Sequence, residues 1–226
     1  TTTGAQTYND AVTLGAATTL NTTNSNIAFA STLNSSSSAR ALTIGAGSGT
    51  VTFTGTVGNS LALGATNITA ATTTNSSTLV GSGVYAITGN AVINGAITGV
   101  TNLSVSGTTA IGADITTTGT QLYSGATTLT VNTTLTTTNS DVTFSSTLNS
   151  NNGTAKTLTI AAGGGTVTMN GAVGGTNVLG ATTITASTFT TGSSGTIAMG
   201  ANALTINTDA ITIGGNLSGS GALTIQ

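Results

Sequence analysis

Apolar and small polar residues alternate along short stretches of this 226-residue chain. Residues 11–15, 26–30, 41–45 and 50–54 read AVTLG, NIAFA, ALTIG and TVTFT. Alternation with a period of two residues, rich in Val, Ile, Thr and Phe, is typical of strands that bury one face. No window has helical spacing, and Thr, Gly and Asn at this density disfavour helices. The pattern therefore predicts an all-β protein.

Clusters of turn-forming residues separate the predicted strands, as at residues 24–26, 35–38 and 45–49. Gly and Asn adopt positive φ readily, and Asn and Ser side chains bond to nearby backbone, so these clusters predict tight turns. Apolar pairs begin at Val12, Ile27 and Leu42, which are evenly spaced along the chain. The chain thus consists of many short strands with frequent turns.

Two β architectures fit this arrangement. A sandwich fills a core about 10 Å thick with sizeable side chains, whereas a solenoid stacks narrow coils whose Val, Ile, Leu and Ala lie on those of the next coil. The apolar residues here are mainly these four, and nothing indicates hairpin pairing. We therefore expect a parallel β-solenoid. Coils of roughly 20 residues, stacked about 4.8 Å apart, would give about eleven coils and an elongated rod of about 50 Å.

The chain contains two copies of one unit. Residues 1–34 and 116–149 are identical at 21 of 34 aligned positions, and residues 40–70 and 156–186 at 19 of 31. This repetition divides the chain into solenoid units at residues 1–115 and 116–226, which we expect to form one continuous rod without a linker. Residues 75–115 and 191–226 align poorly. We expect their coils to be less regular and to differ in cross-section.

Composition excludes several functions. Only 3% of the residues are charged, the net charge is −2, and Arg40 and Lys156 are the only bases. Binding to nucleic acid or to an anionic membrane surface requires clustered Lys and Arg, so we expect neither. The most apolar window, residues 80–100, is interrupted by two asparagines and five glycines. It is a poor spanning helix, so no membrane insertion is expected.

Residues that carry catalysis or bind metals are scarce. The acids are Asp10, Asp114, Asp141 and Asp209. In the other copy Gly125 replaces Asp10 and Asn26 replaces Asp141, so we interpret the acids as turn residues rather than acid–base pairs or metal ligands. There is no His to activate a Ser or Thr hydroxyl, and the single lysine aligns with an arginine. We therefore expect no catalytic, cofactor-binding or metal-binding residues, no cofactor, and a protein that is not an enzyme.

Aromatic residues recur at equivalent positions of the two copies. Tyr8 aligns with Tyr123, and Phe29 with Phe144. A regular row of rings on the surface would suit sugar binding. We prefer the interpretation that these rings fill the wider part of the coil or cap a corner.

Thr-x-Thr runs, as at residues 50–54 and 166–168, resemble the threonine ladders of ice-binding solenoids. Such a face requires one flat ladder that continues from coil to coil. Because the runs recur mainly at the period of the whole unit, we expect the ladder to be broken. Threonine on the outer pleated surface of a strand is the simpler explanation.

The tandem units, the ITTTGTQLY opening at residues 115–123, and the TLTI and GTVTF runs resemble the repeat regions of large secreted bacterial adhesins. These are the filamentous-haemagglutinin-like and autotransporter-type β-strand-repeat proteins. The resemblance implies a right-handed parallel β-helix, secretion across an outer membrane, and a shaft or fibre at the cell surface. The secretion-domain motifs at the N-terminus of that family are absent from this sequence.

Two function classes follow. The first is a non-enzymatic, extracellular structural protein that forms the shaft of a surface fibre, filament or large adhesin. The second is a binding module with an adhesive or ice-binding face, which should carry an insertion or an aromatic cluster, and no long loop stands out. The chain opens directly in repeat sequence at Thr1 and closes in a strand pattern. We therefore expect a piece of a longer protein whose partner is itself, through end-to-end coil stacking or covalent continuation; the sequence identifies no host or surface ligand.

Overall fold

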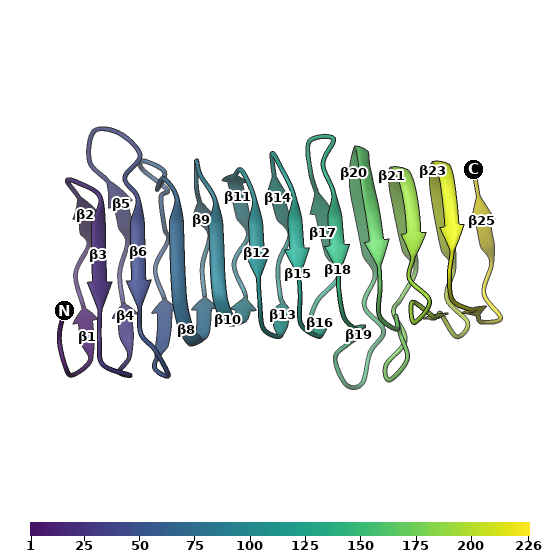
Figure 1. Cartoon of the computed structure of the whole chain (residues 1–226), viewed down its shortest axis with the longest axis horizontal. Helices are drawn as coiled ribbons and strands as arrows, with labels where there is room; N and C mark the ends of the chain where they lie inside the picture. Colours follow the sequence, from purple (N-terminus) through teal and green to yellow (C-terminus); the bar gives the residue numbers. More distant parts are fainter.

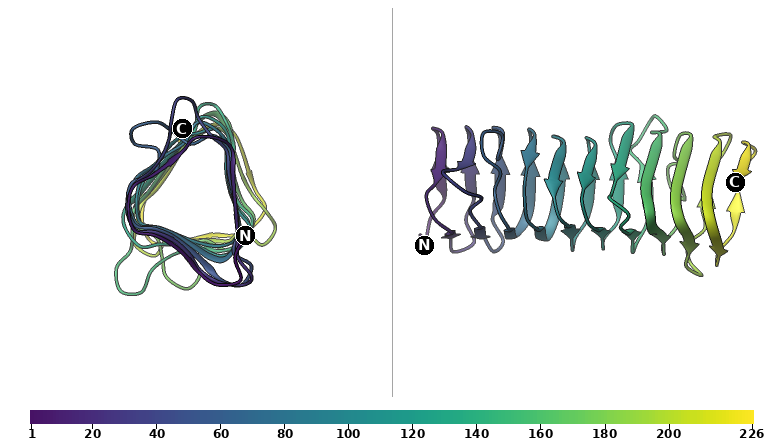
Figure 2. Two further views of the ribbon diagram at one scale, coloured as in Figure 1. Left: turned by 90° about the vertical axis from the view of Figure 1, so that its left-hand side faces the viewer. Right: turned by 90° about the horizontal axis from the view of Figure 1, so that it is seen from above.

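All 226 residues are described by the computed structural model, which is a straight rod of stacked coils (Figure 1). The chain forms 25 strands and no helix, every strand pairing is parallel, and the coils make about ten turns. Viewed along the rod, each coil is a triangle with strands on its sides and loops at its corners (Figure 2). The predicted all-β parallel solenoid is confirmed. The right-handed coil implied by the resemblance stays a prediction.

Strand pairing defines three faces, which we name A, B and C in the order in which the chain visits them. Face A contains β1 (Gln6–Tyr8), β4 (Ile27–Phe29), β7 (Thr50–Phe53), β13 (Thr109–Ile111), β16 (Thr127–Leu129), β19 (Leu148–Ser150), β22 (Ile197–Ala198) and β24 (Leu217–Ser218). Face B contains β2 (Val12–Leu14), β5 (Leu33–Ser35), β9 (Leu79–Val80), β11 (Ile97–Val100), β14 (Ile115–Thr117), β17 (Thr133–Thr136) and β25 (Leu223–Ile225). Face C contains β3 (Thr18–Asn21), β6 (Leu42–Gly45), β12 (Leu103–Val105), β15 (Gln121–Tyr123) and β18 (Val142–Phe144).

Five long strands turn a corner and serve two faces each. They are β8 (Thr66–Asn75) and β10 (Tyr85–Ile93), which run from face C to face A, and β20 (Leu158–Met169), β21 (Thr182–Thr191) and β23 (Leu204–Ile213), which run from face B to face C. Because these strands bend without a loop, the three faces are hydrogen-bonded into one sheet around most of the rod.

Coil length varies along the rod. On face B, Ile97 pairs with Ile115, and Leu135 pairs with Ile160. The coil between Leu135 and Ile160 is therefore longer than the coil between Ile97 and Ile115. The coils between Leu79 and Leu129 are the most uniform, because successive pairings there have almost the same separation on all three faces. The expectation that residues 75–115 are less regular is therefore wrong. That segment lacks the long corner loops that the aligned segments share, so it has the shortest coils.

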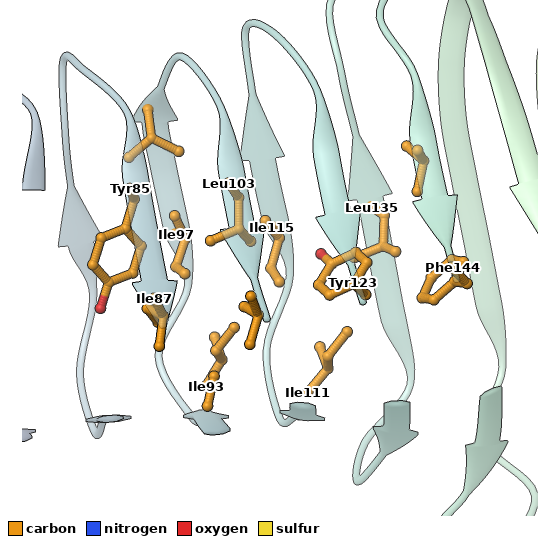
Figure 3. Close-up of a cluster of buried hydrophobic side chains, with 14 of the residues drawn as sticks. Tyr85, Ile87, Ile93, Ile97, Leu103, Ile111, Ile115, Tyr123, Leu135 and Phe144 are labelled. Carbon is orange, nitrogen blue, oxygen red and sulfur yellow. The ribbon is translucent and has the colours of Figure 1, made fainter. Parts of the chain in front are cut away.

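Alternate side chains of each strand point inward and form one continuous core. Its 44 buried residues run nearly the length of the rod. Ile97, Leu103, Ile111 and Ile115 are completely buried in the central coils, where each side chain lies on those of the neighbouring coils (Figure 3). The narrow cross-section explains why β-branched and small apolar residues suffice to fill it.

The second copy of the unit is rotated relative to the first. Gln6 and Tyr8 lie on face A in β1, and their counterparts Gln121 and Tyr123 lie on face C in β15. The chain makes five full turns between β1 and β13, which both lie on face A. It then passes face B and reaches face C at β15. The offset between the copies is therefore five and two-thirds turns. The expected boundary between residues 115 and 116 falls inside β14.

Candidate functional site

Asn and Asp side chains link each coil to the next at the corners. Asn26 Oδ1 accepts a hydrogen bond from the backbone N–H of Thr50 (2.9 Å), and Asp141, at the equivalent position of the second copy, accepts one from Thr166 (2.8 Å). Asp114 binds the N–H of Thr134 in the same way (2.7 Å). Such links satisfy backbone donors that a turn would otherwise leave unpaired.

The other two acids, Asp10 and Asp209, are exposed and stand apart from these links. No three His, Cys, Asp or Glu side chains lie close together. The structure thus brings none of the four acids of the sequence into a shared site.

Loops project from the corners of the triangle (Figure 2). Residues 36–41 follow β5 on face B, and the equivalent residues 151–157 follow β19 on face A. Each loop is closed by a serine hydroxyl that accepts a backbone N–H: Ser35 from Arg40 (2.9 Å) and Ser150 from Lys156 (2.8 Å). These projections were not evident in the sequence, where no long loop stood out. Because the copies are rotated, equivalent loops project in different directions.

A polar hollow lies beside the second of these loops. Its lining consists of Thr128, Asn149, Ser150, Asn151, Asn152, Thr176 and Asn177. The Asn177 amide donates to Asn152 Oδ1 (3.2 Å), and Asn149 Oδ1 accepts the N–H of Thr176 (3.0 Å). The amides therefore mainly hold the loop against the adjacent coil.

The recurring aromatic rings lie in the interior. Tyr8, Phe29 and Phe53 stack in successive coils with ring centroids 4.8 and 5.3 Å apart. The second copy repeats the stack with Tyr123 and Phe144 at 5.0 Å. Phe29, Tyr123 and Phe144 are buried, which confirms that the rings fill the coil rather than form a surface row. Burial raises the pKa of the Tyr123 phenol, and also that of Tyr85, which donates a hydrogen bond to Asn75.

Threonines form an unbroken column on the outer surface of face B. Its members pair successively across five coils: Thr134, Thr159, Thr183, Thr205 and Thr224. A second column, two residues further along the same strands, contains Thr116, Thr136, Ala161, Thr185 and Asn207. We call these two columns the threonine face. The expected break in the Thr-x-Thr ladder is confirmed, because Ala161 and Asn207 interrupt the second column and Thr52 of the run at residues 50–54 pairs with Ala28. The first column is nevertheless continuous, because it is assembled from threonines that do not recur at the period of the whole unit.

The threonine face is uncharged and open to solvent. The hydroxyls of its five-membered column form no hydrogen bond within the protein, and none of them is a buried, unpaired atom. Lys156 and Asp209 lie at the corners on either side of its long strands, and Asp114 lies at the end of the five-membered column, where it accepts the backbone N–H of Thr134. Face C carries a shorter column of the same kind, made of Thr143, Thr168, Thr190 and Thr212.

The chain forms no helix of the length and apolarity that a membrane-spanning segment needs. No family model matches it, and no curated protein or solved structure matches it either. Three kinds of surface are open to a partner: the two coil ends, the projecting loops and the threonine face.

Proposed function

We propose that this chain is a non-enzymatic structural protein that forms part of the shaft of an extracellular fibre, filament or large adhesin on a bacterial surface. The observation that carries the proposal is the parallel ladder, which joins every coil to the next from β1 to β25. In an architecture in which each coil contacts only its neighbours, the length of the rod grows with the number of coils.

The contacts between neighbouring coils support a load-bearing function. Each inner coil is held by backbone hydrogen bonds on both sides, by the continuous core and by corner links such as Asn26 to Thr50. To pull two coils apart, all of these contacts must break together. The shared contacts, rather than any single residue, give the rod its strength.

The proposed partner is a further coil of the same kind. Leu223 and Ile225 in the last coil are 53% and 51% exposed, whereas Leu204 and Ile206, their partners in the preceding coil, are buried. A following coil would cover these side chains, whether it is supplied by the same polypeptide or by a second copy. Burial of apolar area at about 25 cal/mol per Å² favours such stacking.

The extracellular, bacterial assignment rests on the resemblance of the repeat units and on composition. The chain has no cysteine, which is compatible with export of an unfolded chain. Antibodies against the purified protein should label filaments outside intact source cells in electron microscopy. Labelling confined to the cytoplasm would contradict the assignment.

Limited digestion with trypsin tests the load-bearing function itself. The only cleavage sites are Arg40 and Lys156, and both lie in loops between strands. Cleavage there leaves every strand pairing intact, so the nicked rod should sediment like the uncut one until denaturant is added. Fragments that separate in plain buffer would show that the coils do not hold together as a shaft requires.

A further inference from the structure

We propose that the threonine face binds ice, that is, the regular surface of crystalline water. This inference goes beyond the shaft function and does not depend on it. It starts from the five-membered column Thr134–Thr159–Thr183–Thr205–Thr224, which is continuous through the strand pairing of face B.

The strand geometry places the side chains of the two columns on a two-dimensional grid, in which Ala161 and Asn207 stand in place of threonine at two points of the second column. Neighbouring rungs are about 4.8 Å apart along the rod, and the two columns are separated by two residues, or about 6.6 Å, across it. Both repeats are of the order of the spacings between oxygen atoms in planes of ice. The two columns lie on strands of one face that are joined by parallel pairing from coil to coil. A flat grid can meet a flat crystal plane over its whole area.

The grid is also rigid. β20, β21 and β23 are hydrogen-bonded to coils on both sides, so the backbone under Thr159, Thr183 and Thr205 cannot shift independently. Threonine is branched at Cβ, and its χ1 is therefore restricted. Because little side-chain entropy remains to be lost, adsorption of an ordered water layer costs less than it would on flexible side chains.

The chemistry of the face matches a neutral lattice. Each threonine hydroxyl donates one hydrogen bond and accepts others, as a water molecule does. The hydroxyls of the five-membered column are free of protein partners, and no charged side chain belongs to either column. The carboxylate of Asp114, at the end of the five-membered column, is bonded to the backbone N–H of Thr134. A charged group would orient water around itself and disturb the lattice. The methyl groups beside the hydroxyls contribute apolar contact without distorting the spacing.

An uncharged grid could also meet a crystalline polysaccharide or a second rod. The aromatic rings that would stack on sugars are buried in the core, which disfavours the polysaccharide. Free hydroxyls with no apolar neighbour larger than Ala161 in either column disfavour a dry interface between rods. Water in a lattice is the partner that the donor and acceptor pattern fits best.

The test is partition of the purified 226-residue chain into slowly growing ice, together with the gap between its melting and freezing temperatures. Thr183→Tyr places a bulky ring at the centre of the grid, while tyrosine keeps a high strand propensity. The matched control is Thr52→Tyr, an outward position on face A between Ala28 and Thr74. Circular dichroism and thermal melting establish that both variants remain folded.

We expect the unaltered chain and Thr52→Tyr to be enriched in ice and to separate the two temperatures. Thr183→Tyr should lose both effects. Exclusion of the unaltered chain from ice would overturn the proposal, as would equal losses in the two variants. Binding to microcrystalline cellulose in place of ice would assign the face to a polysaccharide and overturn it too. None of these results bears on the trypsin experiment, so failure of the shaft function would be recognised separately.

Discussion

Tyr8 and Tyr123 occupy the same position in the repeat but lie on different faces of the rod, face A and face C. Their hydrogen bonds are nevertheless the same. Each phenol donates to the glutamine two residues earlier, at 3.0 Å to Gln6 and 2.9 Å to Gln121. Each glutamine then donates to a backbone carbonyl of the following coil, that of Asn21 or Thr136, at 2.9 Å. The unit therefore specifies a succession of strands and turns, and that succession can begin on different faces of the rod.

This pair provides a matched test of burial. Gln121→Leu removes these hydrogen bonds, together with two longer ones to Ile115 and Thr117, and leaves the buried Tyr123 hydroxyl without a partner. It should therefore lower the free energy of unfolding by about 2–4 kcal/mol. Gln6→Leu makes the same change in the half-buried first coil, where water can replace the lost partner, and should cost less than about 1 kcal/mol. Denaturant titration measures both. Equal losses would show that the first coil is as well shielded as the interior.

Alkaline pH should destabilise the rod through its buried tyrosines. Burial raises the pKa of Tyr123 and of Tyr85 above the ordinary value of about 10, so both phenols stay neutral in the folded chain. The unfolded chain ionises first. The stabilisation is complete below about pH 10 and is lost as pH rises further, by up to about 1.4 kcal/mol per pH unit for each tyrosine. Urea titrations from pH 8 to pH 11 measure the slope, and Tyr123→Phe should reduce it by about half. An unchanged slope would mean that Tyr123 is not responsible.

The corner of β10 depends on the absence of a side chain. Gly89 has φ of 128°, and a Cβ there would lie 1.8 Å from the carbonyl oxygen of Ala70 in the preceding coil. Gly89→Ala should therefore cost about 3 kcal/mol or more, since backbone has to move on both coils. Gly15→Ala is the control, because a Cβ there would meet no atom within 4 Å. Thermal melting should separate the two variants clearly. Similar melting temperatures would contradict the tight coil contact at this corner.

The fold could be predicted from local alternation, but coil register could not. Ile27 and Phe29 alternate with small polar residues as an inward-facing strand should, and both are buried. The even spacing of Val12, Ile27 and Leu42 does not join stacked residues, because these three begin strands on faces B, A and C. Register depends on the length of each corner loop, and loop lengths leave no regular mark in the sequence.

The threonine face was missed for the same reason. Thr205 and Thr224 belong to a segment that has no good alignment with the first copy, so comparison of the copies could not place them above Thr183. Thr183 pairs with Thr205, and Thr205 pairs with Thr224, although the two coils that separate these threonines differ in length. The turn position of Asp141, in contrast, could be predicted, because asparagine occupies the equivalent position of the first copy. The link that both side chains make to the next coil could not be predicted.

Length set by the number of coils is the central property of the proposed shaft, and insertion of whole coils tests it most directly. Residues 103–120 form one coil in the uniform part of the rod, since Leu103 pairs with Gln121. One to five extra copies inserted after Thr120 should lengthen the particle by about 4.8 Å each, measured by solution X-ray scattering, at a constant cross-section. A shorter insert, residues 106–120 alone, should disrupt the fold because it shifts the register and turns inward residues outward. A wider particle of unchanged length, or equal tolerance of both inserts, would contradict the stacked-coil shaft.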